Sequence, residues 1–319
     1  MNLIICTTPF QMLMAEKIIS LHPDEKFHLI VITHHDNKKY RFYYNRLSRC
    51  CEKFNYIKLL SSGKGKIFTI CDLLYLRILS FFLPMYKSVF LANLENIWLQ
   101  TLLSRFINSS DIYTYDDGTA NIAEGSYLYK EENVGTLKNI VFRLIGKKVS
   151  LKLLKKKSKL HFTIYKSLRN IINETKHIVL YSDDEKTISS NCNQKEYRFF
   201  LGQPIYQFDL ELYNKISQYI NKFDIDYYFP HPREDIVHLK ENYINIIKTE
   251  LIFEDFLIEK LKQNNCKFKV YTLFSGSILN IANFPNVEVY AIKPKSIPED
   301  ISSIYEIFVN SGVTLIEEE

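Results

Sequence analysis

Segments with the composition of buried strands alternate with segments of helical periodicity along the whole chain. Short apolar and aromatic runs are typical of strands covered on both faces, and the segments between them have the spacing of amphipathic helices. This alternation predicts an α/β fold, with parallel sheets and helices on both of their faces. The expected strands are 3–6, 27–33, 88–92, 111–115, 178–181, 197–201, 226–229, 267–272 and 287–291, and the expected helices are 11–20, 72–82, 95–106, 210–221, 253–263 and 277–282.

A length of 319 residues suits two domains, and the second half of the chain repeats the α/β pattern of the first. Residues 146–159 carry seven lysines and no acidic residue, and we expect the domain boundary there, with domains 1–155 and 156–319. Such a stretch is a solvated linker or helix face, or it attracts the phosphates of anionic lipid or lipopolysaccharide. No nucleic-acid-binding motif accompanies it, so nucleic acid is not an expected partner.

The N-terminus lacks a basic region before its first apolar run, so no signal peptide is expected. The apolar run Ile67–Leu83 is interrupted by Asp72 and Arg77, and we interpret it as a buried amphipathic helix. The cysteines show no CxxC spacing, which favours reduced thiols in a cytoplasmic protein over disulfides or a zinc site. They are Cys6, Cys50, Cys51, Cys71, Cys192 and Cys266.

Three polar motifs follow expected strands, and open α/β sheets bind ligands at the carboxyl ends of their strands. An acidic pair, a histidine and a loop of small residues are the groups needed to move a sugar from a nucleotide to a hydroxyl. The motifs are Asp116-Asp117-Gly118, His231-Pro232-Arg233-Glu234 and Phe274-Ser275-Gly276-Ser277.

Asp117 is a candidate general base, because two adjacent carboxylates repel and partial burial would favour the protonated form of one. A metal-binding pair and a plain Asp-Gly turn are the alternatives. His231 is a candidate acid: Pro232 restricts its backbone, and a histidine at a strand end can donate a proton to a leaving phosphate. Arg233 would add positive charge, and Glu234 would orient the side chain of His231 or of Arg233. The alternative is that His231 is only an exposed loop residue.

The segment Phe274–Ser277 precedes an expected helix, so its backbone amides and hydroxyls would bind an anion at the positive helix end. A plain helix cap is the alternative. Glu254 and Asp255 open another expected helix, where a carboxylate can accept hydrogen bonds from ribose hydroxyls or simply complement the helix dipole.

Several segments together resemble the bacterial lipooligosaccharide sialyltransferases, glycosyltransferase family 52. The likeness covers nearly the whole chain in order, so it is more specific than any single motif. The segments are 2–6 with Gln11, 115–121, 161–166, 201–204, 230–233, 254–255, 271–276, 284–287, 292–294 and 298–300.

The resemblance implies the GT-B architecture, in which two Rossmann-like domains face each other across a cleft. We expect 1–155 to be the acceptor-side domain and 156–319 the domain that binds CMP-sialic acid. Expected substrate contacts in the first domain are Thr7, Gln11, Asp116, Gly118 and Thr119. Expected donor contacts in the second are Pro232, Arg233, Glu254, Asp255, Phe274, Ser275, Gly276 and Ser277.

The resemblance also implies an inverting reaction with His231 as general acid and a terminal galactose of lipooligosaccharide as acceptor, joined through an α-2,3 linkage. Asp117 is one candidate base, since related sialyltransferases share an acidic-Asp-Gly motif. Asp209 is the other, although residues 205–208 separate it from Pro204, a longer spacing than in close relatives. No metal or other cofactor is expected, because a CMP leaving group carries a single phosphate.

The expected partners are CMP-sialic acid and galactose-terminated lipooligosaccharide, with contact to an anionic membrane and a homodimer left open. The expected location is the cytoplasm, including the inner face of the inner membrane. Two other functions stay open at this point. One is a hexosyltransferase of the same fold that uses a nucleotide diphosphate sugar, and the other is a non-catalytic module that binds anionic glycolipid through the lysine stretch.

Overall fold

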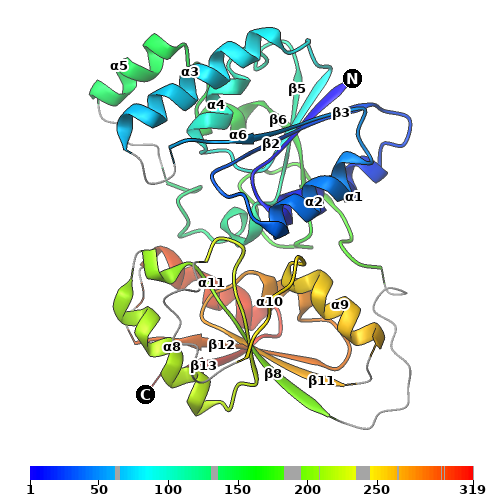
Figure 1. Cartoon of the computed structure of the whole chain (residues 1–319), viewed down its shortest axis with the longest axis vertical. Coiled ribbons are helices and arrows are strands. Elements are labelled where there is room, and N and C mark those ends of the chain that lie inside the picture. The colour runs from blue at the N-terminus through cyan, green and yellow to red at the C-terminus, as the bar shows by residue number, and fades with distance from the viewer. Residues whose placement is uncertain are drawn as a thin grey trace. The chain divides into compact units, whose positions relative to one another are not determined.

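The computed structural model describes the chain except for residues 62–64, 131–135, 183–194, 208, 235–244, 264–265, 296, 298 and 319. The described residues form two compact units, Met1–Leu180 and Tyr181–Glu319, each built on its own parallel sheet (Figure 1). Cys192 and Pro298 lie outside the described residues.

The sheet of the first unit has the strand order β3-β2-β1-β4-β5-β6-β7, with every pair of neighbours parallel. Strands β1, β2 and β4 are buried along their whole length, as expected for strands covered by helices on both faces. The strands are β1 (Asn2–Cys6), β2 (Phe27–Thr33), β3 (Lys53–Lys58), β4 (Ser88–Leu91), β5 (Asp111–Tyr115), β6 (Ser158–Thr163) and β7 (Thr175–His177).

Side-chain caps determine where several helices of this unit begin. The hydroxyl of Thr8 accepts a hydrogen bond from the N–H of Gln11, and Pro9 occupies the first helical position, where its missing N–H costs nothing. The helices are α1 (Pro9–Ser20), α2 (Lys38–Ser48), α3 (Lys66–Phe82), α4 (Ile97–Leu103), α5 (Thr136–Ile145) and α6 (Leu151–Lys157).

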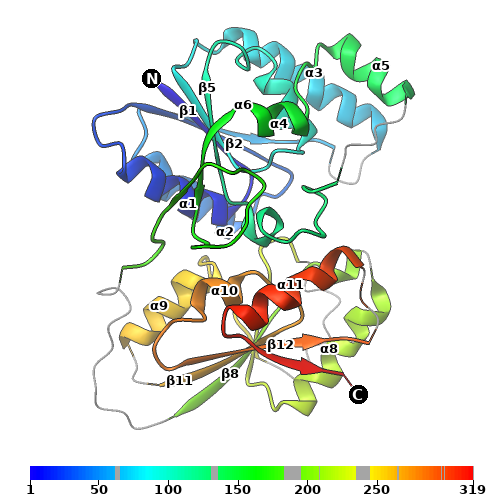
Figure 2. The same ribbon diagram turned by 180° about the vertical axis from the view of Figure 1, so that it is seen from behind.

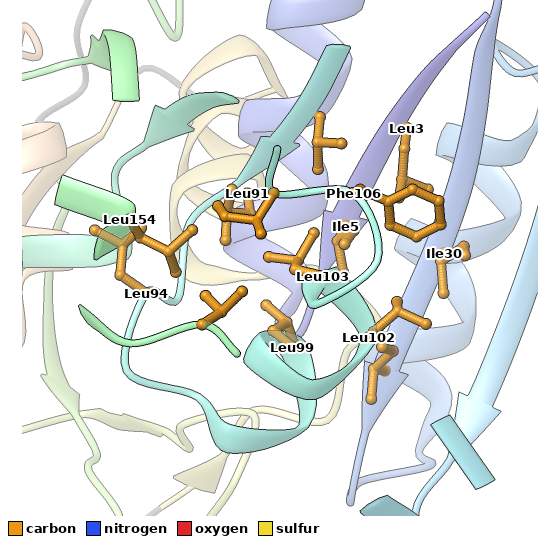
Figure 3. Packing of buried hydrophobic residues seen from close by; sticks show 14 of the residues in the cluster. Leu3, Ile5, Ile30, Leu91, Leu94, Leu99, Leu102, Leu103, Phe106 and Leu154 are labelled. Carbon is orange, nitrogen blue, oxygen red and sulfur yellow. The ribbon is translucent and has the colours of Figure 1, made fainter. Parts of the chain in front are cut away.

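The core of the first unit is formed largely by leucine and isoleucine. Leu99, Leu102 and Leu103 of α4 gather with Ile5 of β1 and Leu91 of β4, and all five are fully buried (Figure 3). Burial of a side chain of this size contributes roughly 1.5–3 kcal/mol, so this cluster anchors α4 to the centre of the sheet.

The second unit repeats the plan, with parallel strands in the order β10-β9-β8-β11-β12-β13. When its strands are counted from β8, both sheets follow the doubly wound order 3-2-1-4-5-6. Its elements are β8 (Glu196–Leu201), α8 (Leu210–Lys222), β9 (Tyr227–Phe229), β10 (Asn245–Ile246), α9 (Phe253–Gln263), β11 (Lys267–Thr272), α10 (Ser277–Ile281), β12 (Val287–Lys293), α11 (Glu299–Asn310) and β13 (Thr314–Glu317).

The doubly wound order identifies the binding edge of each sheet. The order reverses between β1 and β4 in the first sheet and between β8 and β11 in the second. Open α/β sheets bind ligands outside the carboxyl ends of the strands at such reversal points. The loops after β1, β8 and β11 lie at these reversal points, and the loops after β5 and β9 leave the same carboxyl edges of the two sheets.

The boundary between the units lies later than the sequence predicts. The first unit continues to Leu180, because β6 pairs with β5 and β7 pairs with β6. The basic stretch is not a linker: it forms α6, in which Leu151 and Leu154 are buried. The expected strand 178–181 is irregular chain after β7.

The run Ile67–Leu83 forms a helix, α3, as predicted, but the interpretation that this helix is buried is wrong. Most of its large apolar side chains are exposed. In the part of the chain that is described, no helix has both the length and the apolar content needed to cross a bilayer.

Candidate active site

Gln11 joins the ends of β1 and β5 in the first unit. Its buried side chain accepts the N–H of Thr7 through Oε1 at 2.6 Å and donates through Nε2 to Asp117 Oδ1 at 2.6 Å. The orientation of the amide follows from these partners, since an N–H can only donate and a carboxylate accepts. Gln11 therefore holds one oxygen of Asp117 at the carboxyl edge of the sheet.

Asp116 is fully buried and connects β5 to β6. Its Oδ1 lies 2.9 Å from His161 Nε2, and its Oδ2 accepts the N–H of Ile164 at 2.8 Å. His161 Nδ1 in turn lies 2.8 Å from Thr114 Oγ1. These bonds stabilise the chain where β5 ends, and an exposure of 0% leaves no surface of Asp116 for the substrate contact expected from the sequence.

The turn after Asp117 fixes the backbone of that residue. Gly118 has φ of +67°, a left-handed conformation that glycine adopts without strain. It opens a short 3₁₀ helix, η1 (Gly118–Asn121), which brings the buried side chain of Asn121 back to accept the N–H of Asp117 at 2.7 Å. Thr119 is partly exposed in the same turn. Both the main chain and the carboxylate of Asp117 are thus held in place.

His231 lies in the second unit, just after β9. The N–H of Arg233 donates to His231 Nδ1 at 3.1 Å. Because Nδ1 uses its lone pair in this bond, the neutral ring carries its proton on Nε2. Pro232 has no N–H to offer, so Arg233 is the first residue after the histidine that can make the bond. The imidazole therefore has the tautomer that can donate a hydrogen bond from Nε2.

Glu234 anchors the loop that carries His231. Its Oε2 accepts the N–H of His231 at 3.0 Å, and its Oε1 accepts the hydroxyl of Tyr228 at 2.5 Å. Burial raises the pKa of Glu234 from 4.5 to about 7, and these two hydrogen bonds oppose the shift only in part. The carboxyl group next to the histidine loop therefore changes its charge near neutral pH.

Gly202, directly after β8, leaves the space that Glu234 occupies. A Cβ atom at this position would overlap both Glu234 Oε2 and the hydroxyl of Tyr228. Any side chain at residue 202 would force Glu234 and Tyr228 to move and would disturb the hydrogen bonds that Glu234 makes with Tyr228 and His231. This close approach explains the glycine in the segment Leu201-Gly202-Gln203-Pro204.

The segment Phe274–Ser277 lies at the reversal point of the second sheet. The N–H of Phe274 donates to Oε1 of the buried Gln203 at 3.0 Å, so the loop after β11 is joined to the loop after β8. Helix α10 begins at Ser277, as predicted, but has only five residues, and its cap residue Gly276 has no side chain. A helix this short has a weak dipole, so the backbone N–H groups and hydroxyls of the loop would supply most of the attraction for an anion.

Glu254 and Asp255 open α9 as predicted, and they differ in burial. Glu254 is 2% exposed, and its Oε1 accepts the side-chain amide of Asn280 at 2.8 Å, while Ser277 donates a further hydrogen bond. Burial raises the pKa of Glu254. Asp255 is partly exposed and accepts the hydroxyl of Tyr181 at 2.7 Å. Glu254 therefore holds α9 against α10, and Asp255 is the more accessible of the two.

Asp209 caps α8, since its Oδ1 accepts the N–H of Leu212 at 2.8 Å. It shares the second unit with His231, and the two follow the neighbouring strands β8 and β9. Asp117 belongs to the first unit, together with Thr7 and Gln11.

Among the described residues, no group of three or more His, Cys, Asp or Glu side chains is arranged to bind a metal ion.

The sequence model of glycosyltransferase family 52 matches residues 24–296. The chain belongs to glycosyltransferase family 52. It is similar to the CMP-N-acetylneuraminate:beta-galactoside alpha-2,3-sialyltransferase of Pasteurella multocida, with 36% identity over 99% of each chain. It is also similar to N-acetyllactosaminide alpha-2,3-sialyltransferases of Haemophilus influenzae, at 34% identity over 100% of each chain, and of Neisseria meningitidis, at 32% identity over 99% of this chain and 85% of the other.

Solved structures confirm the GT-B fold of this family 52 chain. The UDP-GlcNAc 2-epimerase of Methanocaldococcus jannaschii superposes with a TM-score of 0.57 at 14% identity, covering 99% of this chain and 89% of the other. Arabidopsis thaliana UGT89C1 superposes with a TM-score of 0.54 at 11% identity, covering 99% and 85%. At such low identity these likenesses establish the fold alone.

Sequence reasoning missed the residues that support the site in this family 52 protein. His161, Asn121 and Gln203 are buried polar side chains that bind the backbone or a carboxylate. All three lie in segments that carry the family resemblance, and this resemblance could have identified them as candidates. Tyr228 lies in no such segment, and only the structure places its hydroxyl on Glu234.

Glu234→Gln should remove a pH dependence of stability. The folded pKa of about 7 lies above the ordinary 4.5, so the folded protein binds this proton more tightly than the unfolded chain does. The contribution of Glu234 to folding is therefore fully present below pH 4.5 and is lost as the pH rises through 7, an effect of at most about 3 kcal/mol. We expect urea unfolding at pH 5 and pH 8 to show this decline in the parent and not in Glu234→Gln.

Glu211→Gln, on the exposed face of α8, is the matched control and should decline with pH as the parent does. If the parent and Glu234→Gln respond to pH in parallel, Glu234 does not titrate in this range.

Proposed function

We propose that this family 52 protein is an inverting sialyltransferase that transfers sialic acid from CMP-sialic acid to a terminal galactose through an α-2,3 linkage. The observation that carries the proposal is similarity to alpha-2,3-sialyltransferases along the full length of the chain. The tautomer of His231 supports it, because a donor that leaves as CMP needs a proton or hydrogen bond at its phosphate.

In the proposed reaction, the acceptor hydroxyl oxygen attacks the anomeric carbon on the face opposite the phosphate. The bond between that carbon and the phosphate oxygen breaks, and CMP leaves with the electron pair. His231 acts as the acid by donating a hydrogen bond from its Nε2–H to the departing phosphate oxygen, and an aspartate takes the proton of the acceptor hydroxyl. The aspartate holds the proton that the acceptor loses, and the hydrogen bond from His231 stabilises the charge on the departing phosphate, so the proposed step uses no metal or other cofactor.

We assign the base to Asp117. Its carboxylate is held by Gln11 and its main chain by Asn121, so it has the fixed geometry that proton abstraction requires. Asp209 is the rival, and its Oδ1 already caps α8. Thr7, Gly118 and Thr119 complete the proposed acceptor side, and the fully buried Gln11 supports it by holding Asp117.

We assign donor binding to the second unit. Ser275, Gly276 and Ser277 would contact the phosphate through backbone N–H groups and hydroxyls, with Phe274 next to them in the chain. Pro232 and the exposed Arg233, which follow His231, are assigned to the same donor side. Asp255 would accept hydrogen bonds from the ribose hydroxyls, and Glu254 would hold α10 in position through its hydrogen bond with Asn280.

The proposed acceptor is the galactose-terminated chain of a lipooligosaccharide at the inner face of the inner membrane. Exposed lysines of the basic stretch would then face anionic phosphates. Lys155 donates to the carbonyl of Leu128 and Lys159 lies 2.7 Å from Asp111, so these two are already used within the protein. The exposed lysines that remain are Lys148, Lys152, Lys156 and Lys157.

CMP should stabilise the protein, whereas UDP should not. A ligand at 100 times its Kd adds about 2.7 kcal/mol to the free energy of unfolding, enough to raise the melting temperature by several degrees. Thermal shift measures this, and analysis of the product formed from CMP-sialic acid and labelled lactose should show an α-2,3 linkage with release of CMP. Stabilisation by UDP alone would favour a nucleotide diphosphate sugar as donor, and glycan binding without release of CMP would indicate a binding module.

His231→Ala should fold normally and lose most turnover, because general acid catalysis is worth roughly 10²–10⁴-fold. His177→Ala, on the exposed strand β7, is the control and should keep full activity. Activity of His231→Ala within tenfold of the parent on CMP-sialic acid would exclude the acid role.

Asp117→Asn should damage turnover more than Asp209→Asn. Both changes remove a carboxylate and keep the fold, since asparagine can still accept from Gln11 at residue 117 and is a good helix cap at residue 209. The measurement is kcat on lactose, with CMP binding followed in parallel. If only Asp209→Asn abolishes transfer while CMP still binds, the base is Asp209.

A further inference from the structure

The loops after β2 and β4 meet next to the end of β1. Strand β1 lies between these two strands in the sheet, at the point where the strand order reverses. His34, directly after β2, packs edge-on against Trp98 in the first turn of α4, with ring centroids 4.6 Å apart and 78° between the ring planes. The two rings therefore meet where an open α/β sheet binds its ligand, on the same carboxyl edge as Asp117.

Hydrogen bonds within the first unit hold both loops in one conformation. The hydroxyl of Thr33 accepts the N–H of His35 at 3.1 Å, and the hydroxyl of Tyr56 donates to the carbonyl of His35 at 2.9 Å. Asn96 caps α4, since its Oδ1 accepts the N–H of Trp98 at 3.0 Å. The two rings are thus carried by a fixed backbone, as a preorganised binding site requires.

Polar atoms of three side chains in these loops are covered from solvent and have no hydrogen-bond partner in the described part of the chain. They are Nδ1 of His34, Oδ1 of Asn93 and Nε1 of Trp98. A buried polar atom without a partner is unfavourable, so such atoms are commonly satisfied by a bound molecule. Each of the three side chains is also partly exposed, and their terminal torsions have broad minima, so a small rotation brings these atoms to a ligand hydroxyl.

The chemistry of this group suits a neutral sugar. An aromatic ring can pack against the C–H face of a sugar, while imidazole, amide and indole groups form hydrogen bonds with hydroxyls. Burial lowers the pKa of His34 below its usual 6.5, and the carboxylate of Asp72 opposes this shift only in part, so the imidazole is uncharged at neutral pH. An uncharged group beside a carboxylate gives no attraction to phosphate or to the carboxylate of sialic acid, which disfavours the donor as its ligand.

The group lies beside the proposed base and not at it. Neighbouring strands are about 4.8 Å apart, so the loops after β4 and β2 lie roughly 5 and 15 Å from Asp117 along the edge of the sheet. Both views show α4 with α3 on one face of this sheet and α1, which carries Gln11, on the other (Figure 1 and Figure 2). When the reacting hydroxyl of a galactose lies at Asp117, the next sugar of the acceptor falls within this range.

We propose that His34, Asn93 and Trp98 form a subsite for the neutral sugar to which the terminal galactose of the acceptor is attached. Trp98 packs against the face of this sugar, and His34 and Asn93 bind its hydroxyls. The subsite rests on the proposed function, because it presumes transfer to a galactose. It makes the enzyme select a disaccharide end over a lone galactose, a choice that the acid and the base cannot make.

Rates with lactose and with methyl β-galactoside, which lacks the second sugar, test the proposal. The parent should use lactose with a kcat/KM at least about tenfold higher. Trp98→Ala should lower kcat/KM for lactose about tenfold and leave that for methyl β-galactoside within about twofold of the parent, because it removes contacts to the second sugar alone. His34→Ala and Asn93→Ala should change the two values in the same direction.

Two further variants separate binding from folding. Trp98→Phe keeps an aromatic ring in the packing of α4 and should retain part of the preference for lactose, so the test remains usable if Trp98→Ala does not fold. Leu102→Ala, which changes a fully buried residue one turn further along α4, is the matched control. It should lower the melting temperature and leave the ratio of the two kcat/KM values as in the parent.

Binding of both sugars is followed by ligand-observed NMR alongside the rates. An equal loss on both acceptors in Trp98→Ala overturns the subsite and leaves the proposed function standing, as does a parent that uses both acceptors equally well. A parent that transfers to neither sugar but binds lactose more tightly than methyl β-galactoside, with this preference lost in Trp98→Ala, does the reverse: the proposed function fails and the subsite stands.

Discussion

Parallel pairing of the strands is the constraint on which both halves of the candidate site depend. Parallel neighbours end at the same edge of a sheet, so residues far apart in the sequence meet there without any long-range recognition of their own. Gln11 and Asp117 are 106 positions apart and are joined by a 2.6 Å hydrogen bond. Gln203 and Phe274 are 71 positions apart and are joined in the same way in the second unit.

Buried carboxyl groups then stabilise the loops that leave these edges. Asp72, Asp116, Glu234 and Glu254 all accept hydrogen bonds from backbone N–H groups or from neutral side chains. A buried carboxyl group without such partners would be strongly unfavourable, so each of these loops is held in the one arrangement that satisfies it. The partly exposed groups assigned to chemistry are in this way held in place by carboxyl groups that do not themselves react.

The sequence predicted the fold well where strands are apolar throughout. Strands β1, β2 and β4 lie within one residue of the predicted ranges, because central parallel strands need continuous apolar runs. Strand β3 was missed, since it lies at an edge and most of its side chains are exposed. The boundary was misplaced because lysines at the surface of α6 resemble a linker until Leu151 and Leu154 are seen to be buried.

The sequence predicted the motifs that carry the candidate reactive groups, but it did not predict the residues that hold these motifs in place. Asp117, His231 and the Ser-Gly-Ser loop all lie at the strand ends where the sequence placed them. Periodicity alone could not show which side of α3 faces the core, because apolar residues cover most of the helix surface. The orientation of α3 is instead fixed by the hydrogen bonds of Asp72 and Arg105. The pKa of Glu234 is raised because its carboxyl group is buried beside Tyr228 and Gly202, and this packing cannot be predicted from the local sequence.

The space that Gly202 leaves to Glu234 and Tyr228 has an evolutionary consequence. A carboxyl group from one loop and a hydroxyl from one strand share a volume that exists only while residue 202 has no side chain. Positions 202, 228 and 234 therefore cannot drift independently. A descendant that acquires alanine at residue 202 must shift or shorten both of the other side chains, so substitutions at these three sites should occur together across the family.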